Sequence, residues 1–182
     1  MKKILRKIVY RLGIKKMPKL SKVEECRARG VKIGNNVDLV NAEIDYCFGH
    51  LISIGDNVTI TNSVVLAHDA STKKELGYSK VGCVKIGSNV FIGYGSIILP
   101  NTTIGNKVII GAGTVVSKDV PDNVVIVGNP YRIICSYDSY IERMKNDMKI
   151  KPVSNTLFCD KTEEEWQNFI IDIDKNNGGF DL

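Results

Sequence analysis

The segment IGSNVFIGYGSIILPNTTIGNKVIIGAGTVV, residues 86–116, carries an aliphatic residue at every sixth position. These positions are Ile86, Ile92, Ile98, Ile104, Ile110 and Val116. Four places after each comes a small or β-branched residue, namely Val90, Ser96, Thr102, Val108, Thr114 and Val120. A period of six fits neither an α-helix, with its period of 3.6, nor a single strand, with its period of 2. The segment therefore predicts a repeat architecture.

Short strands separated by a corner every six residues build a triangular solenoid. The aliphatic residue points into the prism, and the residue four places later is small because it also packs inward. Glycine or asparagine beside the aliphatic residue tolerates the corner backbone. One coil cannot bury its own inner face, so several coils must stack. The same frame recurs upstream at Ile33-Gly34 and Ile54-Gly55, so we expect a mainly β solenoid over residues 31–134.

The hexads are interrupted at residues 72–85 and, more briefly, at residues 45–51. We interpret residues 72–85 as a loop extruded from one coil, and extruded loops often carry functional sites. Both interruptions are expected to line the acceptor site.

Helices are predicted on both sides of the solenoid. Ser21 and Glu24 form a capping box, and Gly30 can end the short helix that follows. Residues 3–12 place apolar side chains on one helical face and basic ones opposite. The predicted C-terminal extension, residues 135–182, contains helix candidates at Tyr137–Lys149 and Thr162–Lys175. We expect these two helices to pack over the last coil and cover its edge.

The net charge of +5 is unevenly distributed. Residues 1–30 form a basic N-terminal segment with 11 Lys/Arg against two Glu, whereas the remaining chain is slightly acidic. This balance argues against a basic nucleic-acid-binding domain. Two interpretations of the basic residues 2–12 stay open. The segment could contact an anionic membrane face, or it could pack on a neighbouring coil with solvated lysines.

Cysteine and histidine usage excludes several classes of site. The five cysteines are widely spaced without a C-x-x-C pair, which argues against a disulfide framework or a zinc site and favours a cytoplasmic location. Only two histidines are present, which excludes a three-histidine metal site. We therefore expect no metal. No apolar run approaches the length of a transmembrane helix, and no secretory signal is visible.

Four stretches resemble one known family. They are IGDNVTI at 54–60, VFIGYGSIILP at 90–100, IGAGTVVSKDVP at 110–121 and VGNPYR at 127–132. They are similar to the hexapeptide-repeat acyltransferases of the maltose, galactoside, xenobiotic and capsular polysaccharide O-acetyltransferase group. The resemblance implies a left-handed parallel β-helix and an acetyl-CoA-dependent O-acetyltransferase acting on a sugar hydroxyl.

His68 is the leading candidate for the catalytic base. An imidazole titrates near neutrality, and His68 stands immediately before the extruded loop, where the resembling family carries its catalytic histidine. Asp69 or Glu75 is expected to orient the ring, although adjacent strand residues point to opposite faces, and either acid could bind the sugar instead. His50 is a rival base, expected to be structural or to line the substrate together with Asp45.

The resemblance also assigns the remaining site residues. Backbone amides near Gly93 and Tyr94 would bind the oxyanion. Phe91 stands where galactoside enzymes often carry tryptophan, which puts any role of an indole N–H in doubt. The coenzyme A site would comprise Phe91, Gly111, Ala112, Gly113, Lys118, Asn129, Pro130 and Arg132, with Lys118 and Arg132 meeting phosphates.

In the resembling family, active sites lie between the subunits of a homotrimer. The expected reaction is direct transfer in a ternary complex, because no nucleophilic Cys or Ser elbow is visible. The acceptor would be a sugar or lipid-linked glycan. The sequence leaves open N-acetylation of an amino sugar or drug, a serine-type acetyltransferase, and a non-catalytic hexapeptide scaffold.

Overall fold

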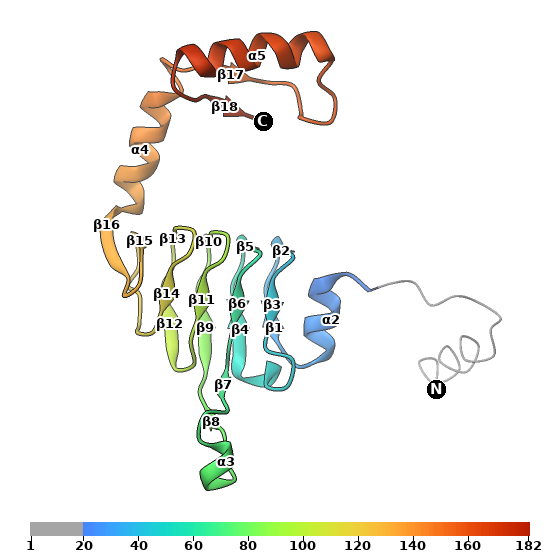
Figure 1. Ribbon diagram of the computed structural model, residues 1–182, viewed down its shortest axis with the longest axis vertical. Helices are drawn as coiled ribbons and strands as arrows, with labels where there is room; N and C mark the ends of the chain where they lie inside the picture. Colours follow the sequence, from blue (N-terminus) through green and yellow to red (C-terminus); the bar gives the residue numbers. More distant parts are fainter. Residues whose placement is uncertain (1–19) are drawn as a thin grey trace, which may run out of the picture.

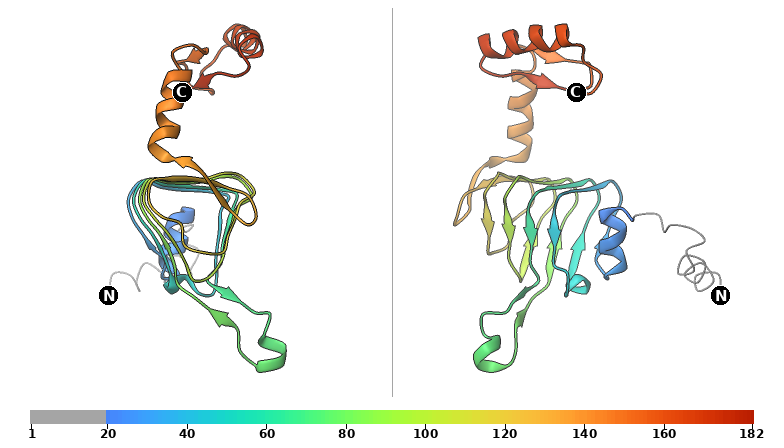
Figure 2. Two further views of the ribbon diagram at one scale, coloured as in Figure 1. Left: turned by 90° about the vertical axis from the view of Figure 1, so that its left-hand side faces the viewer. Right: turned by 45° about the vertical axis from the view of Figure 1, so that its right-hand side comes forward.

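The computed structural model describes residues 20–182 and shows a triangular prism of stacked coils (Figure 1; Figure 2, left). Three parallel sheets form its faces. Sheet A orders β1 (Lys32–Ile33), β4 (Ile52–Ile54), β9 (Val84–Ile86) and β12 (Thr102–Ile104). Sheet B orders β2 (Val37–Val40), β5 (Val58–Thr61), β10 (Val90–Ile92), β13 (Val108–Ile110) and β15 (Val124–Val127), followed by the antiparallel β16 (Arg132–Ser136). Sheet C orders β3 (Glu43–Ile44), β6 (Val64–Val65), β11 (Ile97–Ile98) and β14 (Val115–Val116). The predicted left-handed β-helix class is confirmed.

The core is built from the two inward positions of each hexad. Every aliphatic residue of the opening frame, from Ile86 to Val116, is buried, and so is every residue four places later, from Val90 to Val120. The register is constant, because Val90 stacks between Val58 and Val108 on the neighbouring coils. Equivalent positions therefore lie above one another, and one sequence period specifies one continuous core.

At the corner between sheets A and B, glycine and asparagine have separate tasks, which refines the expectation that either residue tolerates the corner backbone. A Cβ on Gly87 would lie 2.6 Å from the Gly105 carbonyl oxygen of the next coil, so glycine permits close coil stacking. The left-handed backbone is adopted two residues later, at Asn57 and Asn89 and also at Lys107. Asparagine tolerates this conformation, and the Asn57 amide donates to the Asn89 side-chain oxygen at 3.3 Å.

Helix α2 (Lys22–Ala28) covers the first coil. Ser21 and Glu24 form the predicted capping box, and the C-cap is Arg29. The predicted helix over residues 3–12 and the proposed contact of residues 2–12 lie outside the described residues.

The extruded segment is a short antiparallel hairpin, β7 (His68–Asp69) with β8 (Lys80–Val81), tipped by α3 (Lys73–Leu76). Figure 1 shows it projecting from one edge of the prism. It begins and ends four residues earlier than the predicted 72–85. Strand β9 resumes the coil at Val84, which is fully buried and pairs with Ile52. The second interruption contains a tight turn after β3 and the 3-10 helix η1 (Gly49–Leu51).

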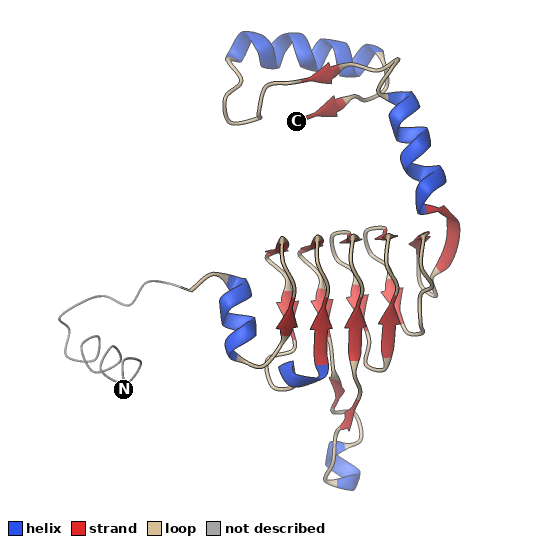
Figure 3. Cartoon of the chain, turned by 180° about the vertical axis from the view of Figure 1, so that it is seen from behind, coloured by secondary structure: helices blue, strands red, loops and turns tan. Residues whose placement is uncertain are grey.

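Both C-terminal helices are present as α4 (Tyr137–Asp147) and α5 (Glu163–Lys175), but α5 does not cover the last coil. It forms an outlying unit with β17 (Val153–Ser154) and β18 (Phe180–Asp181), as Figure 3 shows. Strand β16 instead pairs with β15 and satisfies the exposed backbone of sheet B, so no helix is needed at that edge. Within residues 20–182, no helix is long and apolar enough to cross a membrane.

Candidate active site

His68 lies at the root of the hairpin and contacts Asp45 on the neighbouring coil. His68 Nδ1 is 2.5 Å from Asp45 Oδ2. The His68 side chain is 31% exposed, whereas that of Asp45 is 1% exposed. The imidazole can therefore reach a substrate while its partner carboxylate stays buried, which is the arrangement of an oriented general base.

The Asp45 carboxylate is held by three backbone amides as well as the histidine. Oδ1 accepts from the amides of Cys47 and Phe48 at 3.0 and 3.1 Å, and Oδ2 accepts from Ala67 at 3.0 Å. Burial alone would raise the pKa of Asp45, but the hydrogen bonds from His68 and these amides outweigh it and lower that pKa. Asp45 is thus an ionised positioning residue with its oxygens already bonded, rather than the substrate ligand that we expected.

The two acids expected to orient His68 lie elsewhere. Asp69 points away from the ring and pairs with Lys80 Nζ at 2.6 Å, because consecutive strand residues face opposite sides. The Lys80 contact, followed by hydrogen bonds from Ser71, lowers the pKa of Asp69 to about 2. Glu75 lies in α3 at the tip of the hairpin, exposed to solvent.

His50 packs against the end of α2. A Cβ on Gly30 would overlap the His50 ring, so the two residues are in close contact. The ring that contacts His68 belongs to Phe48, with centroids 4.9 Å apart. His50 therefore has a structural contact, and Phe48, which the sequence analysis missed, supports the imidazole. No hexad signal marks Phe48, because it lies within an interruption of the repeat.

The second predicted element of the site is the corner between sheets B and C, here named the amide corner (residues 62–63, 93–95 and 111–113). The Gly93 N–H donates to the Ile110 carbonyl at 2.8 Å and is therefore engaged. Within the described chain, the N–H groups of Tyr94 and Ala112 donate no hydrogen bond. Tyr94, rather than Gly93, can thus offer an amide to an oxyanion.

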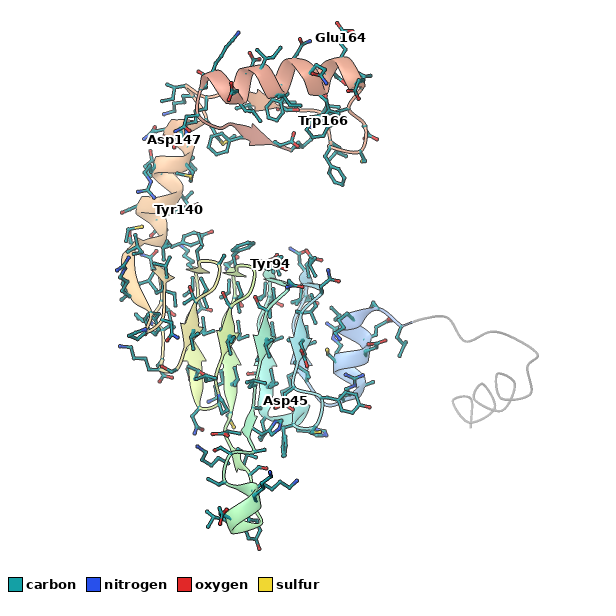
Figure 4. The ribbon with its side chains drawn as sticks, viewed as in Figure 1. Asp45, Tyr94, Tyr140, Asp147, Glu164 and Trp166 are labelled. Atoms are coloured by element: carbon teal, nitrogen blue, oxygen red, sulfur yellow. The ribbon has the colours of Figure 1, made fainter. Side chains whose placement is uncertain are left out.

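His68 lies at a different edge, the corner between sheets C and A, here named the base corner (residues 66–68, 99–101 and 117–119). Figure 4 shows Tyr94 and Asp45 at opposite edges of the prism. Tyr94 lies on the coil next to that of Asn62, because the Gly95 amide donates to the Asn62 carbonyl. His68 is six residues beyond Asn62 along the chain, which gives the distance between the two corners. At about 3.3 Å per strand residue, the corners of one chain are up to roughly 20 Å apart.

The predicted coenzyme A residues are divided between these corners. Gly111, Ala112 and Gly113 stack on the Tyr94 turn, and the Gly113 N–H donates to the Tyr94 carbonyl at 2.8 Å. No atom lies within 4 Å of a Cβ built on Gly95 or Gly113, so the backbone there is open to a ligand. Phe91 is exposed on the adjoining face of sheet B.

The cationic residues lie toward the C-terminal coils. Lys118 belongs to the base corner, and its Nζ sits 5.1 Å from the Tyr131 ring centroid. The Tyr131 hydroxyl donates to the Asp119 carbonyl at 2.5 Å, which ties the VGNPYR turn to that corner. Asn129 and Pro130 are exposed in this turn, and exposed Arg132 begins β16. Open backbone with nearby cations fits a thin ligand that carries phosphates.

Two further observations concern the rest of the described chain. A cavity of about 550 Å³ lies between α2 and residues 34–39 on the first coil, lined by Arg27 and Asp38 among others. In the described part of the chain, no cluster of three or more His, Cys, Asp or Glu side chains could hold a metal ion.

Comparison with known proteins gives consistent matches. Residues 83–118 match the family described as bacterial transferase hexapeptide (six repeats). Protein CapG of Staphylococcus aureus is 44% identical over 138 residues, covering 71% of this chain and 80% of CapG. The galactoside O-acetyltransferase of Escherichia coli is 38% identical over 110 residues, covering 57% of this chain and 53% of that enzyme. The chain thus spans about half the length of that relative.

Among solved structures, a galactoside acetyltransferase in complex with coenzyme A superposes with a TM-score of 0.51. It is 27% identical, and the match covers 69% of this chain and 76% of that one.

Proposed function

The chain belongs to the hexapeptide-repeat acetyltransferase family, and on this premise we propose that it transfers acetyl groups from acetyl-CoA to a sugar hydroxyl of a surface or capsular polysaccharide. The observation that carries the proposal is the contact between His68 and buried Asp45 at the root of the hairpin. The sugar hydroxyl is supported by the similarity to galactoside O-acetyltransferase. The polysaccharide context rests on the resemblance of the hexad motifs to capsule-cluster enzymes.

His68 would act as the general base. With Nδ1 directed at Asp45, its Nε2 is left to take a proton from the acceptor hydroxyl. The ionised carboxylate stabilises the imidazolium that forms and fixes the orientation of the ring. Phe48 packs beside the imidazole and limits its rotation.

The amide corner would bind the other substrate. Bound acetyl-CoA supplies an activated thioester carbonyl. The free N–H of Tyr94 can donate to the oxygen of that carbonyl as negative charge develops. The segment Gly111–Gly113, whose backbone is open at Gly113, would contact the pantetheine arm, and Lys118 and Arg132 would bind the phosphates of coenzyme A.

Because the two corners of one prism lie too far apart to share a substrate, we propose that each site forms between two chains. The base corner of one copy would face the amide corner of the next. Such a contact joins different surfaces on the two partners, so it closes only as a ring. A three-sided prism suits a ring of three, and the proposed assembly is a homotrimer.

The test of the activity is thiol release from acetyl-CoA together with mass spectrometry of candidate sugars. The wild-type protein should acetylate at least one hydroxyl-bearing sugar, and His68→Ala should abolish transfer while the protein stays folded. Acetylation confined to amino groups would assign N-acetyltransferase activity instead. Unchanged transfer by His68→Ala would contradict the assignment of the base.

The shared site can be tested by subunit complementation. His68→Ala removes the base, and Tyr94→Pro removes the amide donor. Each variant alone should be inactive. Trimers that mix the two variants should regain activity, because some interfaces pair an intact His68 with an intact Tyr94. Failure of all folded mixed trimers to regain activity would contradict an inter-subunit site.

The basic N-terminal residues support a proposal about location. We propose that residues 2–12 hold the enzyme at an anionic cytoplasmic membrane face, close to lipid-linked glycans. Liposome co-sedimentation should fall when residues 1–20 are removed. Equal sedimentation of both proteins would favour packing of this segment on the protein itself.

A further inference from the structure

One pair of side chains, carried by the end of α2 and by the turn that holds Asp45, has no role in the reaction described so far. The guanidinium carbon of Arg29 lies 4.0 Å from the centroid of the Tyr46 ring. Tyr46 is 70% exposed, so much of its ring surface stays open to solvent despite the contact with Arg29. Within the described residues, Arg29 forms no ion pair, so its charge is not neutralised by a carboxylate.

The position of Arg29 is fixed by tight backbone packing. It is the C-cap of α2, and its amide donates to the Cys26 carbonyl at 3.0 Å. A Cβ on Gly49 would lie 2.6 Å from the Arg29 carbonyl oxygen, and one on Gly30 would overlap His50. The end of α2 is therefore pressed against η1 through two glycines, and Arg29 is held beside the turn that carries Tyr46.

Tyr46 is equally well placed by the turn around Asp45. The amides of Cys47 and Phe48 bind Asp45 Oδ1, while Oδ2 binds His68. In the sequence, Tyr46 stands between Asp45 and the residues whose amides bind it, Cys47 and Phe48. The Tyr46 side chain is exposed to solvent. One carboxylate thus contacts His68 and, through the same turn, holds the backbone that carries the exposed Tyr46 ring.

We propose that Arg29 and Tyr46 form an acceptor subsite that selects a sugar carrying a negative charge, either a carboxylate or a phosphate. The Tyr46 ring offers an apolar surface to a sugar ring. The Arg29 guanidinium offers forked donors that match both anions. The proposal rests on the proposed function in one respect, since it takes His68 as the base that acts on the bound sugar.

The test measures binding separately from turnover. Saturation-transfer NMR of the full-length protein compares methyl glucuronide with methyl glucoside, and N-acetylglucosamine phosphate with N-acetylglucosamine. We expect one anionic probe to bind at least about tenfold more tightly than its neutral match. The carboxylate and phosphate arms show which anion is preferred. Arg29→Gln should remove the difference, and Arg29→Lys, which keeps the charge, should retain part of it.

The chain contains a matched control. Arg143 also lies over a tyrosine, 5.4 Å from the Tyr140 ring centroid, but in α4, away from His68. Arg143→Gln should leave probe binding unchanged. Three outcomes would each overturn the subsite. They are equal binding of anionic and neutral probes, binding of neither kind of probe, and equal effects of the Arg29 and Arg143 variants. A change of oligomeric mass in Arg29→Gln without a change in anion preference would also overturn it.

These outcomes are independent of the proposed activity. His68-dependent thiol release from acetyl-CoA can persist without anion preference, in which case only the subsite fails. Conversely, anion preference without any His68-dependent release would contradict the proposed function and leave the binding site in place.

Discussion

The Nδ1 atom of His68 lies 2.5 Å from Oδ2 of Asp45, which stands 23 residues earlier on the neighbouring coil. The two residues meet because β3 and β6 stack in parallel, with the Asp45 amide donating to the Val65 carbonyl at 2.9 Å. The contact fixes the orientation of a partly exposed imidazole.

Asp45→Asn should lower kcat for acetyl transfer by about 10²–10⁴, because the ring loses both its orientation and the charge that stabilises the imidazolium. KM for acetyl-CoA should stay unchanged, since the amide corner is untouched. Steady-state kinetics of the folded variant, over a range of pH, measures the effect. Asp69→Asn is the matched control and should stay within about twofold of wild type. Equal losses in both variants would contradict the assigned role of Asp45.

The Asp69 carboxyl should titrate with a midpoint of about 2 in the folded protein. Its pKa is lowered chiefly by Lys80, so the native contact is present above the unfolded value near 3.9 and is lost as the pH falls towards 2. NMR titration of the Asp69 side-chain carboxyl measures the midpoint. Lys80→Met should raise it, and a native midpoint near 3.9 would show that the ion pair does not form.

Gly87→Ala should destabilise the solenoid, because the new Cβ would lie 2.6 Å from the Gly105 carbonyl oxygen and the coils would have to separate. Gly77→Ala is the comparison, because a Cβ added at Gly77 would have nothing within 4 Å. The only unfavourable effect there is the φ of 76°, which a residue with a side chain rarely adopts. That conformational cost is about 1 kcal/mol. Thermal unfolding should therefore show a larger loss for Gly87→Ala. The reverse order would argue that backbone conformation, not coil contact, requires the glycine.

Lys107→Asn should raise Tm. Lys107 adopts a φ of 53° at the corner where neighbouring coils carry Asn89 and Asn123, so asparagine relieves strain of about 1 kcal/mol and extends the amide ladder. The loss of its exposed contact with Asp138, at 3.5 Å, costs less. Calorimetry should show a rise of a few degrees, of the order expected for a chain of this size. Lys107→Ala, which cannot form the ladder, should not match it.

The regular coils could be predicted from the sequence, whereas the side-chain contacts within the interruptions could not. Ile92 and Thr102 were correctly predicted to point inward, because burial in a solenoid repeats with the chain. Asp69 was one of two acids expected to orient the His68 ring, but strand alternation turns it toward Lys80. Phe48 lay in an interruption, where no period indicated its direction.

The sequence by itself determined the prism, its inward residues and the position of His68 beside an extruded segment. These properties depend on local periodicity, because each hexad repeats the same pattern of inward-pointing positions. The tertiary structure decided that Asp45 holds the imidazole, that Tyr94 has the free amide, and that the two lie at different corners. The physical reason is stacking register. Contacts between coils depend on how many residues each interrupted coil contains. The length of an interruption does not show, from the sequence alone, which residues it brings into contact.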